Sequence, residues 1–407
     1  MPEKTYRVYA YRWVILLAFS LVNLSIQMLW ICFAPVTGPA AQFYRVSDQQ
    51  IGFLAMSFMI VYVPLSIPIS WMIDTLGYRK AVNIGVVLMA VFGLLRGFSG
   101  ASYPLVMITT LGLAVAQPFM MNAVSTVAAR WFPIQERATA SGLALVASFI
   151  GIAIGQVTSP MLITSYNIPT MLLVFGAAAA LTSVLFLVLA RDAPPTPPCP
   201  PDQAGRALVF DGLKSMLALK DIWLLLVMFL VGLGIFNGVT TWIEEIVRPK
   251  GFSIQQAGDL GGYLLLGGIF GAIIIPVLSD HFRRRKHFLM IGLALTVPSL
   301  LVVTFAATFD LMVASMLALG FSLMGLAPIG YQYAAEITYP APEGTSNGLL
   351  NLAGQVSVVF VYAMQAVRGA DGTFTLSLVI LAVLIGICSL LVTAMRESTL
   401  LTSLNPK

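Results

Sequence analysis

Long apolar runs separated by short polar breaks dominate the chain. Each of twelve such runs holds about 20 or more mostly apolar residues, enough to cross the hydrocarbon core of a bilayer as a helix. Six runs precede one long proline-rich break and six follow it, which predicts an all-α membrane protein made of two six-helix bundles. The predicted spans are 12–36, 48–73, 80–98, 103–129, 137–164, 168–190, 221–246, 253–279, 286–307, 310–336, 344–367 and 372–395.

The composition excludes a water-soluble protein. Hydrophobic residues make up 58% of the 407 residues and charged residues 10%, whereas soluble domains average about 45–50% and 25%. The first run lacks a small-residue cleavage site and is longer than a signal-peptide core, so we expect it to remain as a membrane helix. Cys32, Cys199 and Cys388 lie far apart, so we expect no disulfide framework, metal site or other cofactor.

The long break, residues 191–206, divides the chain nearly in half. Its prolines cannot continue a helix and favour an extended, semi-rigid linker. Just beyond it, Val209, Leu213 and Met216 recur at helical spacing, as in a helix lying on the membrane surface; an irregular continuation of the linker is the alternative. The predicted domains are residues 1–190, the linker and amphipathic segment 191–220, and residues 221–407.

Polar positions repeat between the two halves at one ungapped offset of 206 residues. The shift places Ser47, Gln50 and Gly52 on Ser253, Gln256 and Gly258; Asp74, Arg79 and Lys80 on Asp280, Arg285 and Lys286; and Thr139 and Gly142 on Thr345 and Gly348. The serine and glutamine of each first group have the spacing of a capping box at a helix start. A repeated six-helix unit is typical of transporters that rock two bundles about a site near the membrane midplane.

The distribution of cations predicts the orientation. If the N-terminus is cytoplasmic, seventeen of the 22 lysines and arginines lie at cytoplasmic helix ends; Arg45, Arg96, Arg248, Lys250 and Arg368 lie on the other side. The positive-inside rule therefore predicts that both termini and the linker are cytoplasmic. We expect a multi-pass protein of the plasma (cell inner) membrane.

The loop SWMIDTLGYRK, between the second and third predicted helices, resembles a loop of the major facilitator superfamily, G-x-x-x-D-x-x-G-R-[RK]. PVLSDHFRRRK is its counterpart in the second half, with Arg283 where the pattern has a glycine. The resemblance implies that these charges form a latch on the cytoplasmic side. Arg130 and Glu336, at equivalent ends of the fourth and tenth predicted helices, are expected to belong to it. An ordinary positive-inside loop explains the arginines but not two matched aspartates. The predicted latch residues are Asp74, Gly77, Arg79, Lys80, Arg130, Asp280, Arg284, Arg285 and Glu336.

A narrower resemblance rests on three stretches: AEITYPAPEGTSNGLLNLAGQV at 335–356, LVNLSIQMLWICFAPV in the first helix and YVPLSIPISWMIDTLGYRK in the second. All three are similar to the feline leukaemia virus subgroup C receptor-related family, a branch of that superfamily. Its members are linked to choline and ethanolamine, to other small organic cations and to haem export. The resemblance implies that Trp30 and Gln355 contact the substrate, while the family's aromatic residue in helix 7 is not cleanly reproduced.

The residues themselves also predict a polar, uncharged site. Asn23, Gln27 and Trp30 share one face of the first helix, and Asn351 and Gln355 share one face of the eleventh. Polar side chains in hydrocarbon are costly unless they line a cavity or bond to each other, and hydrogen bonds that only hold the bundle together are the alternative. The predicted substrate-binding residues are Trp30, Gln355, Asn23, Gln27, Asn351, Asn237, Thr241, Phe236, Trp242 and Gln117.

Charged residues avoid the middle third of every predicted helix. Glu244, Glu245 and Asp259, near the outer ends of helices 7 and 8, are candidates for a vestibule or for coupling. Without a central titratable group we expect facilitative transport of an ammonium-bearing solute, held in part by aromatic faces. His281 and His287 lie in a predicted cytoplasmic loop, which does not suit a haem ligand at the midplane.

Two other functions compete with this interpretation. One is a proton-coupled or exchange transporter of another small metabolite, an organic anion or a drug. The other is a membrane enzyme, which would need a clustered nucleophile, base or metal set that the sequence does not supply. We therefore expect a monomeric transporter, not an enzyme, whose partners are a small-molecule substrate and the lipid bilayer, with no nucleic acid.

Overall fold

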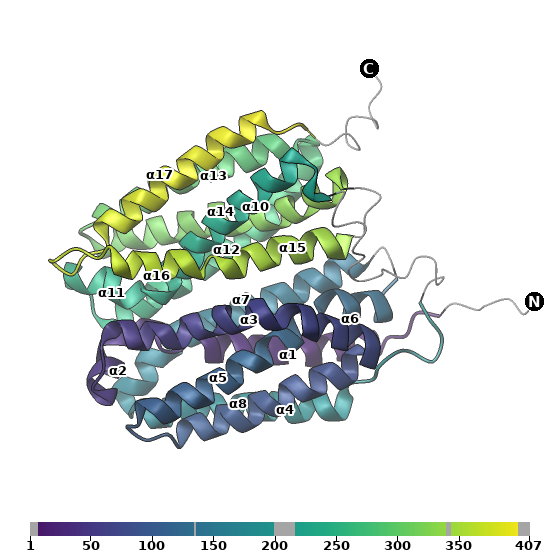
Figure 1. Cartoon of the computed structure of the whole chain (residues 1–407), viewed down its shortest axis with the longest axis horizontal. Coiled ribbons are helices and arrows are strands. Elements are labelled where there is room, and N and C mark those ends of the chain that lie inside the picture. Colours follow the sequence, from purple (N-terminus) through teal and green to yellow (C-terminus); the bar gives the residue numbers. More distant parts are fainter. Residues whose placement is uncertain (1–6, 134–135, 199–215, 339–342, 398–407) are drawn as a thin grey trace, which may run out of the picture. The chain divides into compact units, whose positions relative to one another are not determined.

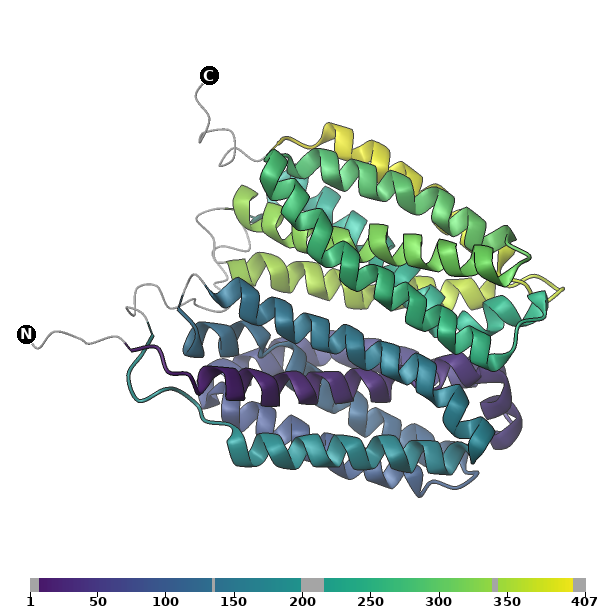
Figure 2. The same cartoon turned by 180° about the vertical axis from the view of Figure 1, so that it is seen from behind.

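The structure is a computed structural model that describes residues 7–133, 136–198, 216–338 and 343–397. Those residues form helices and no strands, and they contain twelve helical segments long and apolar enough to span a membrane (Figures 1 and 2). The predicted fold class is confirmed. Val209 and Leu213 of the predicted amphipathic segment lie outside the described residues.

Contacts within the chain divide it into two units. Among the described residues, the first unit takes 7–33 and 39–198, and the second takes 34–38 and 216–397. The short segment Ala34–Gly38, which includes the 3₁₀ turn η1 at Ala34–Val36, therefore belongs by its contacts to the second unit although it directly follows the first helix.

The first unit contains eight α-helices in its described part. Helix α1 packs on α7 and α8, α4 packs on α5 and α8, and α3 packs on α5. The helices are α1 (Arg12–Ile31), α2 (Thr37–Tyr44), α3 (Asp48–Leu76), α4 (Tyr78–Gly97), α5 (Tyr103–Met121), α6 (Val124–Trp131), α7 (Arg137–Ser165) and α8 (Ile168–Leu189).

The second unit repeats this design. Helix α12 packs on α14, α13 on α14 and α17, and α10 on α15 and α16. The helices are α10 (Lys220–Thr241), α11 (Ile243–Val247), α12 (Ile254–Phe282), α13 (Arg285–Phe305), α14 (Phe309–Ile337), α15 (Glu343–Val356), α16 (Val358–Ala366) and α17 (Thr375–Leu391), with 3₁₀ turns η4 (Arg248–Lys250) and η5 (Val392–Ala394).

Small residues let the helices approach closely. A Cβ at Gly151 in α7 would lie 2.1 Å from the carbonyl oxygen of Leu24 in α1. In the second unit, a Cβ at Gly267 in α12 would lie 2.1 Å from the carbonyl oxygen of Leu317 in α14. Such contacts are typical of membrane helices, where association depends on close packing because lipid is as apolar as the helix surface.

Both predicted capping boxes are present. Ser47 accepts a hydrogen bond from the backbone N–H of Gln50, whose side chain accepts one from the N–H of Ser47. Ser253 and Gln256 do the same at the start of α12. The two units therefore start equivalent long helices with the same local device.

Several predicted spans are interrupted. The first bends into a 3₁₀ turn after α1, and others break between α5 and α6, α10 and α11, and α15 and α16. Asn122 lies at the break between α5 and α6. Its Nδ2 donates to the carbonyl oxygen of Ser66, and its Oδ1 accepts a hydrogen bond from the hydroxyl of Tyr62. The side chain of Asn122 thus ties the break between α5 and α6 to α3.

Candidate functional site

In the first unit, two of the predicted amides meet. Nε2 of Gln117 in α5 donates to Oε1 of Gln27 in α1 at 3.1 Å, and both side chains are buried. Asn23, one turn earlier, donates to the carbonyl oxygen of Phe19 at 2.9 Å and is 1% exposed. On the face of α1 predicted from helical spacing, Gln27 is therefore bonded to a side chain of α5, and Asn23 is bonded to the backbone of α1 itself.

Trp30 lies on the same side of α1 and is fixed by a single hydrogen bond. Its indole Nε1 donates to the carbonyl oxygen of Ala55 in α3 at 3.0 Å, and the residue is 6% exposed. Because the only polar atom of the ring is already bonded, the indole can offer only its π-face and edges to any further contact.

In the second unit, polar side chains gather where α10 ends and α15 gives way to α16. Nδ2 of Asn237 donates to the hydroxyl of Ser357 at 3.1 Å, at the break between α15 and α16. Thr240 donates to the carbonyl oxygen of Phe236, and Phe236 and Thr241 are buried. The Thr240 hydroxyl thus bonds to the backbone, while the Asn237 amide links two helices.

Trp242 marks the break between α10 and α11. Its Nε1 donates to the carbonyl oxygen of Val361 at 2.9 Å, and its ring stacks on Phe374 with centroids 6.0 Å apart. Trp242 is fully buried, and these contacts link the break after α10 to α16 and to the loop after it.

Asn351 and Gln355 have different surroundings. Oδ1 of Asn351 accepts a hydrogen bond from the hydroxyl of Tyr331 in α14 at 2.5 Å, and the Tyr331 ring lies 5.0 Å from that of Phe229 in α10. Gln355 is half-buried. The sequence patterns did not point to Tyr331 or Phe229, and only their aromatic character among aliphatic neighbours could have signalled them.

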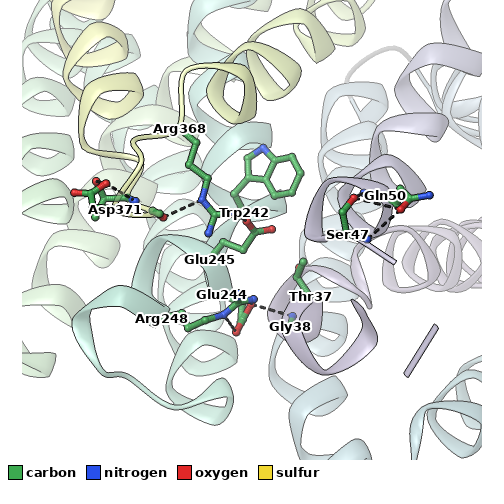
Figure 3. A network of polar contacts seen from close by, with 12 residues as sticks. Thr37, Gly38, Ser47, Gln50, Trp242, Glu244, Glu245, Arg248, Arg368 and Asp371 are labelled. Carbon is green, nitrogen blue, oxygen red and sulfur yellow. Dashed lines mark hydrogen bonds and ion pairs between the residues drawn. The ribbon is translucent and has the colours of Figure 1, made fainter. Parts of the chain in front are cut away.

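Glu244 and Glu245 are neighbouring buried carboxylates, and each has its own arginine (Figure 3). Glu244, 3% exposed, binds both Nε and Nη2 of Arg248, and its Oε2 also accepts the backbone N–H of Gly38 at 3.2 Å. Glu245 binds Nη1 of Arg368 at 2.6 Å. Both acids are thus compensated within the second unit.

Three further charged residues of the second unit lie in α12, in η4 and in the loop after α16. Asp259 is half-buried and accepts a hydrogen bond from Nε2 of Gln255 at 3.0 Å. The backbone N–H and the hydroxyl of Thr373 hold the pKa of Asp371 below its ordinary value. Lys250 donates to three carbonyl oxygens at the end of α13, and burial lowers its pKa to about 8.

The predicted latch residues of the first unit pair differently from our expectation. Arg130 binds Oδ2 of Asp192 at 2.6 Å, and Oδ1 of Asp192 accepts the backbone N–H of Arg79 at 3.4 Å. Gly77 has a positive φ of 85°, and a Cβ there would lie 2.7 Å from Oδ1 of Asp192. Asp74 and Lys80 are exposed. The acid that binds Arg130 therefore lies after α8, outside the motif loop.

The second unit brings three of its four predicted latch residues together, while the fourth, Arg284, is exposed. Arg285, 6% exposed in its side chain, binds Asp280 and, at 3.1 Å, Glu336. The carboxylate of Glu397 accepts the backbone N–H of Arg285 at 2.9 Å, which matches the role of Asp192 in the first unit. Arg191–Asp192 and Arg396–Glu397 are equivalent dipeptides 205 residues apart, so the ungapped offset of 206 residues does not superpose them.

Within the residues that the structure describes, no three His, Cys, Asp or Glu side chains gather as a metal site. In the first unit, bonded amides lie on α1 and α5. In the second unit, amide and aromatic groups lie on α10, α14 and α15. Such groups can bind a polar or cationic solute but offer no nucleophile with a neighbouring base.

Known membrane transporters resemble this chain along most of its length. The model of the Major Facilitator Superfamily matches residues 15–362 and 244–403. Solute carrier family 49 member A3 of Danio rerio is 31% identical over 379 residues, which cover 89% of this chain and 79% of that protein. The choline/ethanolamine transporter FLVCR2 of Rattus norvegicus is 29% identical over 366 residues, covering 85% and 67%.

Solved structures give the same fold. A bacterial homologue of the human lysosomal transporter Spinster, crystallised in an inward-facing and unoccupied conformation, aligns with a TM-score of 0.73. The alignment covers 98% of this chain and all of that one at 16% sequence identity, so the likeness concerns the fold alone.

Proposed function

Because the chain belongs to the major facilitator superfamily, and within it to the feline leukaemia virus subgroup C receptor-related proteins, we propose that it carries a small organic cation resembling choline or ethanolamine. It is a multi-pass membrane transporter, and the fold is that of alternating-access carriers. We propose that transport, with no catalytic step, is its whole activity.

The observation that supports a cationic substrate best is the fixed indole of Trp30 on the helix that also carries the Gln27–Gln117 pair. The Ala55 carbonyl occupies the indole N–H, so the ring is oriented before any ligand arrives. An aromatic face attracts an ammonium group by about 2 kcal/mol or more when both are desolvated. Amide oxygens can contact the same group without bringing a net negative charge into the bilayer.

The second unit carries its own candidate substrate contacts. We propose that Asn237, Thr241, Phe236, Asn351 and Gln355 face the substrate, with Tyr331 as an additional contact through Asn351. Trp242 is assigned a supporting role because its ring stacks on Phe374 and its N–H is bonded to Val361.

We propose facilitative transport without proton coupling. Glu244 and Glu245 each bind an arginine, so a coupling proton would have to compete with a guanidinium for either carboxylate. Asp259, half-buried and bonded to Gln255, is the residue on which a proton-coupled alternative would depend. Uptake driven by a pH gradient, and lost in Asp259→Asn, would favour that alternative.

We further propose that the protein acts as a monomer in the plasma membrane with both termini in the cytoplasm. The cations of the predicted latch and the acids that bind them, among them Arg130 with Asp192 and Arg285 with Glu336, then lie on the cytoplasmic side. On this orientation, residues 1–190 and 221–407 are the moving bundles, and residues 191–220 connect them.

Uptake of radiolabelled choline and ethanolamine into proteoliposomes tests the proposal. We expect uptake by the wild-type chain, independent of a pH gradient, and a loss of at least tenfold in Trp30→Ala and Gln355→Ala. Trp71→Ala is the matched control, because Trp71 is 65% exposed on the surface of α3. Wild-type uptake rates in both site variants would refute the site, and no uptake of any organic cation would refute the substrate class.

A further inference from the structure

Helix α12 ends in a backbone conformation that normally belongs to glycine. The N–H of Arg283 donates to the carbonyl oxygen of Asp280, and the N–H of Arg284 donates to that of Ser279, each at 3.2 Å. These two bonds define a Schellman motif, in which Arg283 holds the left-handed position with φ of 53° and ψ of 41°. Any residue with a Cβ is strained there, and glycine is not.

The first unit has a glycine at the equivalent place. An offset of 206 residues pairs Arg283 with Gly77, which also has a positive φ. Gly77 has φ of 85° and ψ of 147°, whereas Arg283 lies in the left-handed region, so the two repeats share the positive φ but not the full conformation. Because a left-handed conformation costs an arginine more than a glycine, backbone geometry alone does not account for Arg283 at this turn.

The basic residues around this turn differ in their partners. Arg285 is bound by Asp280 and Glu336, and Nζ of Lys286 donates to the carbonyl oxygen of Thr393 at 2.7 Å. Arg283 and Arg284 are exposed, and no ion pair among residues 7–133, 136–198, 216–338 and 343–397 involves either of them. The turn thus presents two adjacent guanidinium groups to its surroundings.

An apolar stripe leads to these arginines. Ile274, Leu278 and Phe282 follow one another at four-residue spacing on α12 and are 41%, 40% and 59% exposed. In a membrane helix, exposed apolar side chains of this kind face lipid tails. Phe282 stacks on Phe288 of α13 with centroids 6.1 Å apart, so that the last apolar group of the stripe is held beside the turn.

We propose that the turn at Arg283 and Arg284 binds the phosphate of an acidic phospholipid whose tails lie along the Ile274–Phe282 stripe. Guanidinium groups form charge-assisted, often bidentate, bonds with phosphate. Acidic lipids are concentrated in the cytoplasmic leaflet, so a physiological role rests on the proposed orientation but not on the proposed substrate. Arg283 is retained at a glycine position because it supplies one of the two guanidinium groups.

Lipid binding by the purified full-length chain tests this proposal separately from transport. The chain in neutral detergent is titrated with dioctanoylphosphatidylglycerol, with dioctanoylphosphatidylcholine and with inorganic phosphate, while thermal unfolding is followed by tryptophan fluorescence. We expect phosphatidylglycerol alone to raise the unfolding temperature. Its apparent affinity should fall about fivefold for each of Arg283→Gly and Arg284→Gln.

Arg283→Gly also shows whether a loss of lipid binding arises from misfolding. Arg283→Gly relieves the strained backbone, so without lipid its unfolding temperature should equal or exceed that of the wild type. Arg45→Gly is the matched control, because Arg45 is the other exposed arginine with a positive φ, at 55°, and lies in the first unit.

The proposal is overturned if both Arg283→Gly and Arg284→Gln respond to phosphatidylglycerol as the wild type does. An equal loss of response in Arg45→Gly would show a general charge effect and would also overturn it. So would an equal response to phosphatidylcholine or to inorganic phosphate, because the first needs no acidic headgroup and the second needs no lipid. Loss confined to the Arg283 and Arg284 variants supports it.

Discussion

Glu245 and Arg368 form an ion pair whose two members differ in their access to solvent. The Glu245 side chain is 0% exposed and that of Arg368 is 21% exposed. Arg368 also donates to the carbonyl oxygen of Gly372 at 2.9 Å and lies 5.2 Å from the centre of the Phe374 ring. The arginine therefore keeps favourable contacts if it loses the carboxylate, whereas Glu245 without Arg368 loses a cationic partner at a site closed to solvent.

This asymmetry predicts unequal costs for the two single substitutions. Arg368→Gln should lower the free energy of unfolding by about 3–5 kcal/mol, the range for stranding one member of a buried pair. Glu245→Gln should lower it by about 1–3 kcal/mol, the cost of a lost hydrogen bond at a buried site. The double variant should be more stable than Arg368→Gln alone, because it contains no uncompensated carboxylate.

Unfolding of the full chain in mixed micelles, titrated with SDS and followed by tryptophan fluorescence, measures these differences. Asp371→Asn is the control, since Asp371 lies in the loop that follows α16 and is exposed. Within the described part of the chain, its side chain bonds to Thr373 of the same turn. Equal destabilisation by Glu245→Gln and Arg368→Gln would contradict an unequal cost that arises from the different burial of the two side chains. So would a double variant whose destabilisation is the sum of the two single effects.

Three further predictions concern packing, capping and pH. Gly267→Leu should prevent α12 from packing on α14 and abolish a monodisperse peak in gel filtration, while Gly142→Ala, with open space around its Cβ, should leave the peak unchanged. Asp192→Asn should lower the free energy of unfolding by about 1–2 kcal/mol through its weakened bonds to Arg130 and the start of α4, and an unchanged SDS midpoint would contradict this. Burial lowers the pKa of Lys250 to about 8, so the folded state binds this proton less readily than the unfolded state. The free energy of unfolding should therefore rise between about pH 8 and pH 10.5, the ordinary pKa of lysine. Lys250→Met should remove this contribution to the dependence of stability on pH.

Local sequence signals were sufficient to predict the membrane-spanning helices and the capping boxes at the start of two of them. The apolar runs predicted the spans because a bilayer demands about 20 apolar residues per crossing. Ser47 with Gln50, and Ser253 with Gln256, predicted capping boxes because that interaction involves residues only three positions apart. The breaks at Trp242 and Ser357 were not predicted, since the apolar run continues through both positions.

Contacts between distant residues account for most of what the sequence could not show. Arg130 binds Asp192, 62 residues away, and Glu397 caps a helix start 112 residues away. Helical spacing placed Gln27 on a polar face, but its partner Gln117 comes from another helix at a register that spacing alone does not fix. The substrate role of Trp30 and Gln355 stays a prediction that rests on the family resemblance and on the chemistry of their surroundings.

We propose that this transporter recognises the positive charge of its substrate through uncharged amide and aromatic groups. Competition for radiolabelled choline uptake in proteoliposomes by 3,3-dimethylbutan-1-ol, the neutral isostere of choline, tests it most directly. We predict that unlabelled choline inhibits uptake and that the isostere at the same concentration inhibits at least tenfold more weakly. Equal inhibition by the two compounds would show that shape alone is recognised and would contradict the account.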